Sequence, residues 1–401
     1  MDEIVLQEAV EILLSRTKKI QEKEMISLWE APGRVLAEDV YAMHSQPPFD
    51  RSPLDGYAVR SEDIKDASQI NPIKLKVLCE VDAGHVSEEK VREGTAIRIM
   101  TGAPIPDGAD CVIRQEDTDY GEDIVEIYES VGSYENYCFQ GEDYKEGTLM
   151  MAEGTELTAI ETGILASLGR DCICVYRRPR AAVLTTGDEI TLPGEPLAAG
   201  KIYDSNMYTV ATRLMLLGIE VVSKERLKDE PEQAAEHIRR IMQDVDIIVT
   251  TGGVSVGKKD IMHDVIRLLS CERLFWRIDM KPGMPTLCAQ HEDKLLICLS
   301  GNPFGATANV ELIVRPVLAK LSGRKSLIPK KVKAISQSTF PKRSEVTRYV
   351  RALYEDGKVR IPNGSNDSGV LSTMRGCNCM IELPAGLPEL KEGDEICVVL
   401  L

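Results

Sequence analysis

The chain has 401 residues, of which 43 % are hydrophobic and 28 % are charged, and its formal net charge is −16 at pH 7. This length exceeds what one compact core usually supports, so we expect roughly two to four domains in a globular protein of ordinary composition. The acidic balance argues against broad nucleic-acid binding, which needs a basic face. An anionic ligand must therefore be attracted by local cations, backbone N–H groups or metal ions.

The eleven cysteines form no disulfide framework, and no pair has the spacing of a zinc knuckle. This usage is typical of reduced thiols in a cytoplasmic protein. Residues 1–10 are acidic and lack the apolar run of a signal peptide. No stretch reaches the ~18 apolar residues of a membrane span. The sequence therefore predicts a cytoplasmic protein that binds neither a membrane nor nucleic acid.

The first half of the chain combines helical patterns with a β-rich stretch. Apolar residues at helical spacing predict a helix over residues 2–15. Residues 71–150 alternate apolar and polar side chains in short runs between turn residues, which indicates strands. A capping box at 158–161 begins another helix, which Gly169 ends, and a strand follows at 172–176. We expect this helix and strand to pack with the N-terminal helix, so that the β-rich module is an insertion.

From residue 180 to 322, strand and helix patterns alternate, which predicts a doubly wound, mostly parallel sheet. Residues 331–401 return to strand patterns and predict a small all-β domain. The expected fold is thus multidomain α/β plus β. We expect a discontinuous N-terminal helical domain (1–45 and 146–178), an inserted β-rich module (46–145), a doubly wound domain (179–327) and a β-barrel-like C-terminal domain (328–401).

Doubly wound sheets bind ligands beyond the carboxyl ends of their strands. This rule gathers four polar loops on one rim, at 186–189, 229, 251–260 and 300–303. In the third loop, residues 252–258 fit the GxxxxGK of a P-loop, but Lys259 stands where a P-loop has Ser or Thr for Mg²⁺. The residues alone leave three alternatives, which are a P-loop, another anion-binding loop, and a tight turn that needs glycine.

Acidic residues also gather on the expected rim. Asp188, Glu189, Asp229 and Asp260 would repel a phosphate unless Mg²⁺ lay between them, and Mg²⁺ takes one or two carboxylates together with substrate oxygens. The alternative is that each of them is an ordinary solvated carboxylate. Lys281 is placed to neutralise a phosphate directly, or it is a surface lysine before a turn.

Several motifs together resemble one family, the molybdopterin molybdotransferases, which include the E domain of gephyrin. The resemblance spans nearly the whole chain. It rests on PPFDRSPLDGYAVR, RIMTGAPIPDGAD, GEDYKEG, LTTGDE, YDSN, TTGGVSVGKKD, KPGMP and LSGNPFG, which occur in the family's order. It implies that the glycine loop at 252–260 binds molybdopterin and that the P-loop match is a coincidence.

The resemblance implies a Mg²⁺-dependent transferase that inserts molybdate into adenylated molybdopterin, releasing AMP and the molybdenum cofactor. It also implies an elongated homodimer, in which one subunit's doubly wound domain and the other's β-rich module share a site. The implied partners are a molybdopterin adenylyltransferase and downstream cofactor-handling proteins. The alternatives are a tungstate-inserting homologue, a non-catalytic scaffold of the gephyrin type and a related adenylate-processing enzyme.

The loops and the resemblance together assign site residues. The catalytic set is Asp55, Thr101, Glu189, Asp229 and Asp260, and the last three would hold the metal. The substrate-binding set is Asp143, Thr186, Gly187, Asp188, Gly252, Gly253, Ser255, Lys281, Ser300, Gly301, Asn302, Pro303, Arg351 and Ser368. Met284 stands where some members have a second lysine.

Overall fold

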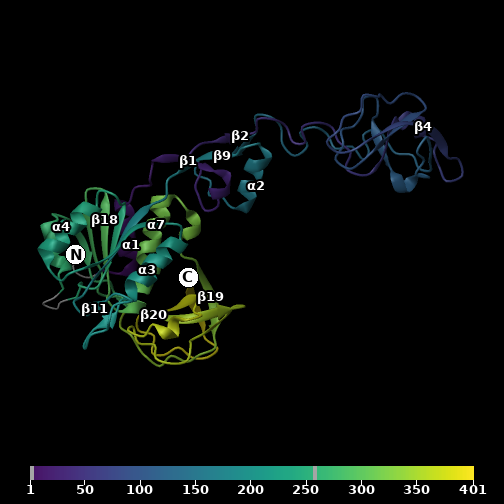
Figure 1. The fold of residues 1–401 in the computed structure, drawn as a ribbon. Helices are drawn as coiled ribbons and strands as arrows, with labels where there is room; N and C mark the ends of the chain where they lie inside the picture. Colours follow the sequence, from purple (N-terminus) through teal and green to yellow (C-terminus); the bar gives the residue numbers. More distant parts are fainter. Residues whose placement is uncertain (1–3, 256–259) are drawn as a thin grey trace. The chain divides into compact units, whose positions relative to one another are not determined.

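The structure is a computed structural model, and it describes residues 4–255 and 260–401 (Figure 1). The chain divides into two compact units. The main unit comprises Met1–Ala37, Gly154–Gly163 and Asp171–Leu401, and the inserted unit comprises Glu38–Glu153 and Ile164–Arg170. None of the described helices is long and apolar enough to cross a membrane.

The inserted unit is built on a five-stranded sheet with the order β6-β3-β5-β4-β7. Successive side chains point to opposite faces of a strand, and both faces are buried here. Tyr57 and Val59 enter one core, whereas Ala58 enters the other. The β-rich prediction for this stretch is therefore confirmed. The strands are β3 (Gly56–Val59), β4 (Ile73–Val81), β5 (Thr95–Ile99), β6 (Cys111–Arg114) and β7 (Ile124–Ile127), with a separate short ladder of β2 (Val40–Tyr41) and β8 (Leu149–Met151).

Helix α2 (Ala159–Ser167) begins as its sequence predicts, because the N–H of Thr158 donates to Oε2 of Glu161 at 2.9 Å. Strand β9 (Cys172–Tyr176) pairs with β1 (Lys23–Ser27). Helix α1 (Leu6–Arg16) packs instead against helix α7 (Arg315–Ser322) of the doubly wound region, where Ala9 and Leu13 are buried. The expected packing of the N-terminal helix with residues 158–176 is therefore wrong, because its apolar face is covered elsewhere.

The main unit contains a six-stranded sheet with the order β13-β10-β14-β18-β17-β15. The first four strands are parallel, as predicted, and the last two are antiparallel. The sequence does not signal the antiparallel pairing of β17 with its neighbours, because the turn before β18, at Glu292, contains no glycine, proline or asparagine. The strands are β10 (Arg180–Thr186), β13 (Glu220–Leu227), β14 (Ile247–Thr251), β15 (Glu272–Trp276), β17 (Leu287–His291) and β18 (Lys294–Leu299).

Helices cover both faces of this sheet (Figure 1). One face carries α3 (Asn206–Leu216) and a continuous helical run, and the other carries α4 (Pro231–Ile241) and α5 (Met262–Leu268). The run consists of α6 (Pro303–Asn309), the π-helical turn η4 (Val310–Val314) and α7 (Arg315–Ser322). Alternation within β14 explains the layers, because Val249 faces the first group of helices and Ile248 faces the second.

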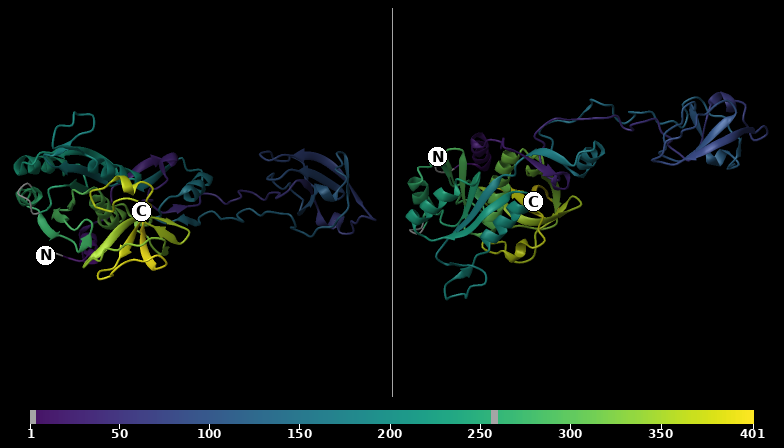
Figure 2. Two further views of the ribbon diagram at one scale, coloured as in Figure 1. Left: turned by 90° about the horizontal axis from the view of Figure 1, so that it is seen from below. Right: turned by 45° about the horizontal axis from the view of Figure 1, so that its top comes forward.

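The C-terminal strands form a closed ring in which β20 pairs with both β21 and β22 (Figure 2). Strand β16 (Met280–Lys281), which precedes this domain in the chain, adds to the ring parallel to β20. The ring consists of β19 (Lys331–Ser336), β20 (Thr347–Glu355), β21 (Lys358–Arg360), β22 (Cys379–Leu383) and β23 (Glu395–Leu400). A further small ladder, β11 (Ile190–Thr191) with β12 (Ile202–Tyr203), follows β10.

Candidate functional site

The carboxyl ends of the four parallel strands meet at one edge of the sheet. Thr185 of β10 lies opposite Thr251 of β14, and Thr251 lies opposite Leu299 of β18. On the other side, Thr186 lies opposite Leu227 of β13. The strand register therefore brings together the four polar loops that follow these residues, and we call this edge the rim.

The rim encloses a cavity of about 340 Å³. Several predicted site residues line it, namely Thr186, Glu189, Gly252, Gly301, Asn302 and Pro303. Its remaining polar walls come from Thr185, Tyr203, Asp204, Ser205, Asn206 and Thr251, and of these only Thr251 lies in a loop that the sequence places on the rim. The signal for Asp204 and Asn206 was present in the YDSN motif, which carried the resemblance without being assigned a role.

The glycine loop after β14 packs closely against Thr186. Gly252 has φ +87°, and a Cβ there would lie 2.6 Å from the carbonyl oxygen of Thr186. Gly253 has φ +66°, and its Cβ would lie 2.6 Å from Oγ1 of Thr186. Backbone conformation and close packing thus require both glycines whatever the ligand is. Ser255 is exposed, and the P-loop alternative depends on Gly257 and Lys258, which lie outside the described residues.

The second predicted loop, between β18 and α6, is held by short polar contacts. Oγ of Ser300 accepts a hydrogen bond from the N–H of Asn302 at 3.3 Å. The carbonyl oxygen of Gly301 accepts one from Nδ2 of Asn206 at 2.7 Å. Asn302 is the N-cap residue of α6, and Pro303 occupies the first helical position.

Three acidic residues follow the ends of β10 and β13. Oδ2 of Asp229 accepts a hydrogen bond from the N–H of Asp188 at 2.8 Å. A Cβ at Gly187 would lie 2.8 Å from Oε1 of Glu189, so the Glu189 carboxylate folds over that glycine. Burial raises the pKa of Asp229, and the negative charges of Asp188 and Glu189 raise it further. This concentration of negative charge favours a cation.

The described residues contain no group of three Asp, Glu, His or Cys side chains that is arranged to hold a metal ion. The metal role of Glu189, Asp229 and Asp260 therefore stays a prediction. Oδ1 of Asp229 is buried and has no hydrogen-bond partner within 4–255 and 260–401. A carboxylate oxygen without a protein partner, acted on by the negative charge of Glu189, fits Mg²⁺, which takes few protein ligands and completes its shell with substrate oxygens and water.

Asp260 lies just before helix α5, which begins at Met262 and has seven residues. Its charge acts on His263, whose pKa is nevertheless lowered, chiefly by burial. The imidazole of His263 contacts the ring of Trp276 edge to face at 4.9 Å between centroids, and Nε1 of Trp276 donates to the carbonyl oxygen of Val254 at 3.1 Å. These contacts hold the two described ends of the glycine loop against β15.

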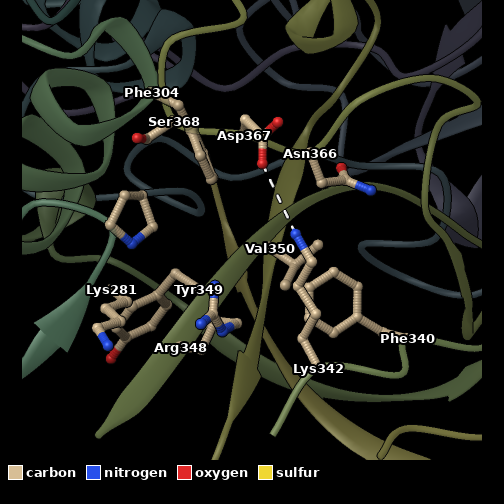
Figure 3. A pocket seen from close by; sticks show the side chains of 11 residues that line it. Lys281, Phe304, Phe340, Lys342, Arg348, Tyr349, Val350, Asn366, Asp367 and Ser368 are labelled. Atoms are coloured by element: carbon tan, nitrogen blue, oxygen red, sulfur yellow. Dashed lines mark ion pairs between the residues drawn. The ribbon is translucent and has the colours of Figure 1, made fainter. Parts of the chain in front are cut away.

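A second cavity, of about 200 Å³, lies next to the C-terminal ring (Figure 3). Its cationic side chains are Lys281, Arg348 and Lys342, and the last pairs with Asp367 at 3.6 Å. Lys281 and Arg348 are Cα partners in the adjacent strands β16 and β20. The cationic pocket, as we call it, suits an oxyanion. Motifs alone did not reveal Arg348, because only the pairing of β16 with β20 brings it beside Lys281. Lys342 lines the same pocket from the segment before β20.

The rim cavity and the cationic pocket share two segments of the chain. Pro303 lines the rim cavity, whereas the next residue, Phe304, lines the cationic pocket. Likewise, Ser368 lines the pocket and Gly369 lines the rim cavity. The N–H of Phe304 donates to the carbonyl oxygen of Ser368 at 3.0 Å. The two sites are therefore neighbours, separated only by these paired segments.

The paired segments around Phe304 and Ser368 form a partition between the two cavities. Arg351 lies beneath this partition and is 1 % exposed. Its guanidinium donates to the carbonyl oxygen of Asp367 at 2.7 Å and to that of Val370, and it lies 4.5 Å from the ring centre of Phe304. Burial lowers the pKa of Arg351. The sequence analysis assigned Arg351 to substrate binding, but the geometry favours a positioning role because its N–H groups hold the 367–370 segment.

The inserted unit contains the remaining predicted residues. Thr101 donates two hydrogen bonds to Oδ1 of Asp55, one from its backbone N–H at 2.7 Å and one from Oγ1 at 2.6 Å. These bonds, the hydroxyl bond first, lower the pKa of Asp55. Asp143 is exposed, and its N–H donates to the carbonyl oxygen of Gln46 at 2.9 Å. The structure thus joins Asp55 with Thr101.

Three family models match successive parts of the chain. Residues 4–169 match "MoeA N-terminal region (domain I and II)", residues 182–320 match "Probable molybdopterin binding domain", and residues 333–401 match "MoeA C-terminal region (domain IV)". The second match covers the doubly wound region and its rim. Fold and site thus define the class as a multidomain protein built around a domain of the molybdopterin-binding type.

Relatives and solved structures agree with this class. Proteins named molybdopterin molybdenumtransferase from Staphylococcus epidermidis and Staphylococcus aureus are each 35 % identical to the chain. The alignments cover 99 % and 94 % of this chain and 95 % and 90 % of those proteins. The molybdopterin biosynthesis moeA protein from Pyrococcus horikoshii OT3 matches over 100 % of both chains, with TM-score 0.84 and 31 % identity. The chain belongs to the molybdopterin molybdenumtransferase family, as its motifs predicted.

Proposed function

We propose that this chain inserts molybdate into adenylated molybdopterin and releases AMP and the molybdenum cofactor. The observation that carries the proposal is the rim cavity directly beside the cationic pocket, which gives a pterin ligand and an oxyanion adjacent places. The 35 % identity to proteins named molybdopterin molybdenumtransferase, over 99 % of this chain, supports the same reaction.

The side chains divide the work of binding between the two substrates. Lys281 and Arg348 present adjacent positive charges to molybdate, and Arg351 fixes the partition from below. The rim loops hold the adenylated pterin with its anhydride near Asp229 and Glu189. These two carboxylates would hold a magnesium ion, which when bound supplies positive charge to the phosphate oxygens. Lys281 and Arg348 keep molybdate beside the two pterin thiolates, which replace one oxo ligand of molybdenum, and that oxygen takes up two protons and leaves as water. A second water molecule adds to the phosphate anhydride, whose P–O bond breaks so that AMP leaves.

The proposal includes a homodimer in which the inserted unit of one copy supplies Asp55 and Thr101 to the rim of the other. The charged, oriented carboxylate of Asp55 supports this role, since it is held ready for a ligand by Thr101. The proposal further includes a molybdopterin adenylyltransferase as the supplier of substrate, downstream cofactor-handling proteins as recipients, and a cytoplasmic location. The proposal keeps the ranges 46–145, 179–327 and 328–401 for the inserted module, the doubly wound domain and the C-terminal domain, and it leaves α1 out of the N-terminal domain because α1 packs against α7.

The test is an AMP-release assay. Purified protein is incubated with adenylated molybdopterin and Mg²⁺, with molybdate, with tungstate, or with neither oxyanion. We expect AMP and the metal-loaded pterin to form together only when an oxyanion is present. Release of AMP that ignores both oxyanions would identify an adenylate-processing enzyme, and no release in any arm would identify a non-catalytic scaffold. Either result contradicts the proposed function.

A further inference from the structure

Asp204 is a buried carboxylate in the wall of the rim cavity. It follows β12 and precedes α3, it is 3 % exposed, and it lines the cavity. Its Oδ1 accepts a hydrogen bond from the N–H of Met207 at 3.0 Å, which fixes the side chain. Its Oδ2 is buried and has no hydrogen-bond partner in the part of the chain that the structure describes. This oxygen is therefore a fixed, unused acceptor at the cavity.

A second unused polar atom lies on the wall that β10 provides. Oγ1 of Thr186 is buried and likewise lacks a partner among the residues the structure describes. By contrast, Asn206, which lines the same cavity, uses its Nδ2 to hold the carbonyl oxygen of Gly301 at 2.7 Å. Buried polar atoms in folded proteins are nearly always hydrogen-bonded, so two unpartnered atoms at one cavity indicate where ligand groups bind.

The chemistry of Asp204 specifies what kind of ligand group it accepts. An ionised carboxylate is an acceptor only, and it pairs best with two parallel N–H donors. Oδ2 of Asp204 accepts one donor, and Oδ1, which already accepts from Met207, has a second lone pair for the other. A pterin has such donors on its aminopyrimidinone edge, in the 2-amino group and N3–H. We propose that Asp204 recognises this edge and thereby selects a pterin. The inference rests on the proposed function, because it assumes that the pterin enters the rim cavity, and it adds the residue that reads the ring.

This assignment predicts a specific discrimination between ring systems. Lumazine has the pterin ring with an oxygen in place of the 2-amino group. That oxygen would face the Asp204 carboxylate, so that two acceptors oppose each other and one donor is lost. A site built to hydrogen-bond a donor rejects the analogue lacking it, so we expect the wild-type chain to bind pterin about 10-fold or more tightly than lumazine.

The experiment is a fluorescence titration of pterin and of lumazine with the full-length chain. Asp204→Asn keeps the shape of the side chain and its acceptor for Met207, but it removes the charge. We expect this variant to bind both rings within about 2-fold of each other, because an amide no longer favours the donor pair. Asp244→Asn is the matched control, since it removes one exposed carboxylate at the opposite end of β14, and it should keep the wild-type preference.

Because the two affinities are compared within each protein, a general loss of folded material does not change their ratio. Retention of the pterin preference in Asp204→Asn would overturn the inference. The inference would also be overturned if the wild type bound the two rings equally or bound neither. The two outcomes for the wild type can be measured without any variant, so they do not depend on whether Asp204→Asn folds. The AMP-release assay reports separately on the proposed function, so an active wild type without the Asp204-dependent preference refutes only this inference.

Discussion

Thr101 donates both its backbone N–H and its hydroxyl to a single oxygen of Asp55, at 2.7 and 2.6 Å. Both bonds favour the ionised carboxylate, and they lower the pKa of Asp55 below its ordinary value, the hydroxyl bond contributing most. In the proposed function, this arrangement keeps an oriented negative charge on the inserted unit throughout the neutral pH range.

Thr101→Val removes the hydroxyl bond and keeps the side-chain shape. We expect the pKa of Asp55 to rise, because one of the two donors to its charged form is lost. A carboxylate with a depressed pKa stabilises the folded state above its unfolded pKa, and this stability is lost as pH falls through the folded pKa. In Thr101→Val this contribution is smaller, and its loss is complete at a higher pH, because the folded pKa lies closer to the unfolded value. Carboxyl NMR titration measures the shift.

Activity provides a second readout for the same pair. The acidic limb of the pH–rate profile should move to higher pH in Thr101→Val, with turnover lowered about 10-fold, a typical scale for one positioned group. Thr101→Ser is the control, because it keeps the hydroxyl and should keep the wild-type limb. An unchanged limb in Thr101→Val would show that the pair has no part in the reaction.

Asp229→Asn should separate stability from activity. The folded pKa of Asp229 is raised by burial and by Asp188 and Glu189. A raised carboxyl pKa means that the folded state is favoured while Asp229 is protonated, and that this advantage is lost as pH rises through the folded pKa. Removing the charge should therefore raise Tm at pH 7 and change it little below the ordinary Asp pKa.

The same variant should lower turnover by about 10²-fold, since the proposed cation site loses a ligand. Calorimetric scans at pH 7 and pH 3.5, together with the AMP-release assay, test both parts. Asp244→Asn, at the opposite end of β14, serves as the charge-matched control. Full activity of Asp229→Asn would contradict the account of Asp229. So would a difference in Tm between variant and wild type that is less favourable to the variant at pH 7 than at pH 3.5.

Sequence periodicity was sufficient for most of the fold. Alternation identified β4 to β7 in the inserted unit but not β3, and the βα pattern identified β10, β13, β14 and β18, because these strands bury one or both faces. It failed where the determining contact is distant in sequence. The partner of α1 is α7, roughly 300 residues further along, and no local pattern specifies such a contact.

The candidate site follows the same division. The rim could be predicted, because parallel strands end at a common edge. Thr186 and Thr251 are the last residues of β10 and β14, and Ser300 directly follows β18. Arg348 could not be predicted, because only the pairing of β16 with β20 places it beside Lys281. The burial of individual side chains could not be predicted from the sequence either. The sequence therefore could not distinguish Arg351, whose guanidinium is enclosed, from an arginine that contacts substrate.

Mixing two inactive variants tests the proposed shared site. Asp55 belongs to the inserted unit and Asp260 to the main unit. If each site combines the two units from different copies, a heterodimer of Asp55→Asn and Asp260→Asn contains one intact site. After full exchange of equal amounts, we expect about a quarter of wild-type activity, because half the dimers are mixed and each has one active site of two.

Subunit exchange must be verified, for example by pulling down one tagged variant together with the other. Each variant exchanged with itself is the control and should remain inactive. Absence of recovery in a preparation with proven heterodimers would refute a site shared between copies. A chain that stays monomeric at working concentration would refute the dimer itself.

Gly283 tests the support of the cationic pocket. It has φ +95°, and a Cβ there would lie 2.1 Å from Oδ1 of Asn309. Asn309 is fully buried, and its Nδ2 donates to the carbonyl oxygen of Gly283 at 3.2 Å and to Oγ1 of Thr286 at 2.6 Å. The segment that presents Lys281 is therefore held from helix α6 by an asparagine that leaves no room for a side chain.

Gly283→Ala should lower the free energy of unfolding by about 3 kcal/mol or more, because overpacking adds to the cost of a positive φ. It should also weaken molybdate binding, since the segment carrying Lys281 must move. Gly357→Ala is the matched control: Gly357 has φ +77° with no atom near its would-be Cβ, so only the conformational cost of about 1 kcal/mol applies. Urea unfolding and molybdate-dependent AMP release measure the two effects. Equal destabilisation by both substitutions, with unchanged molybdate dependence, would show that Asn309 does not position Lys281.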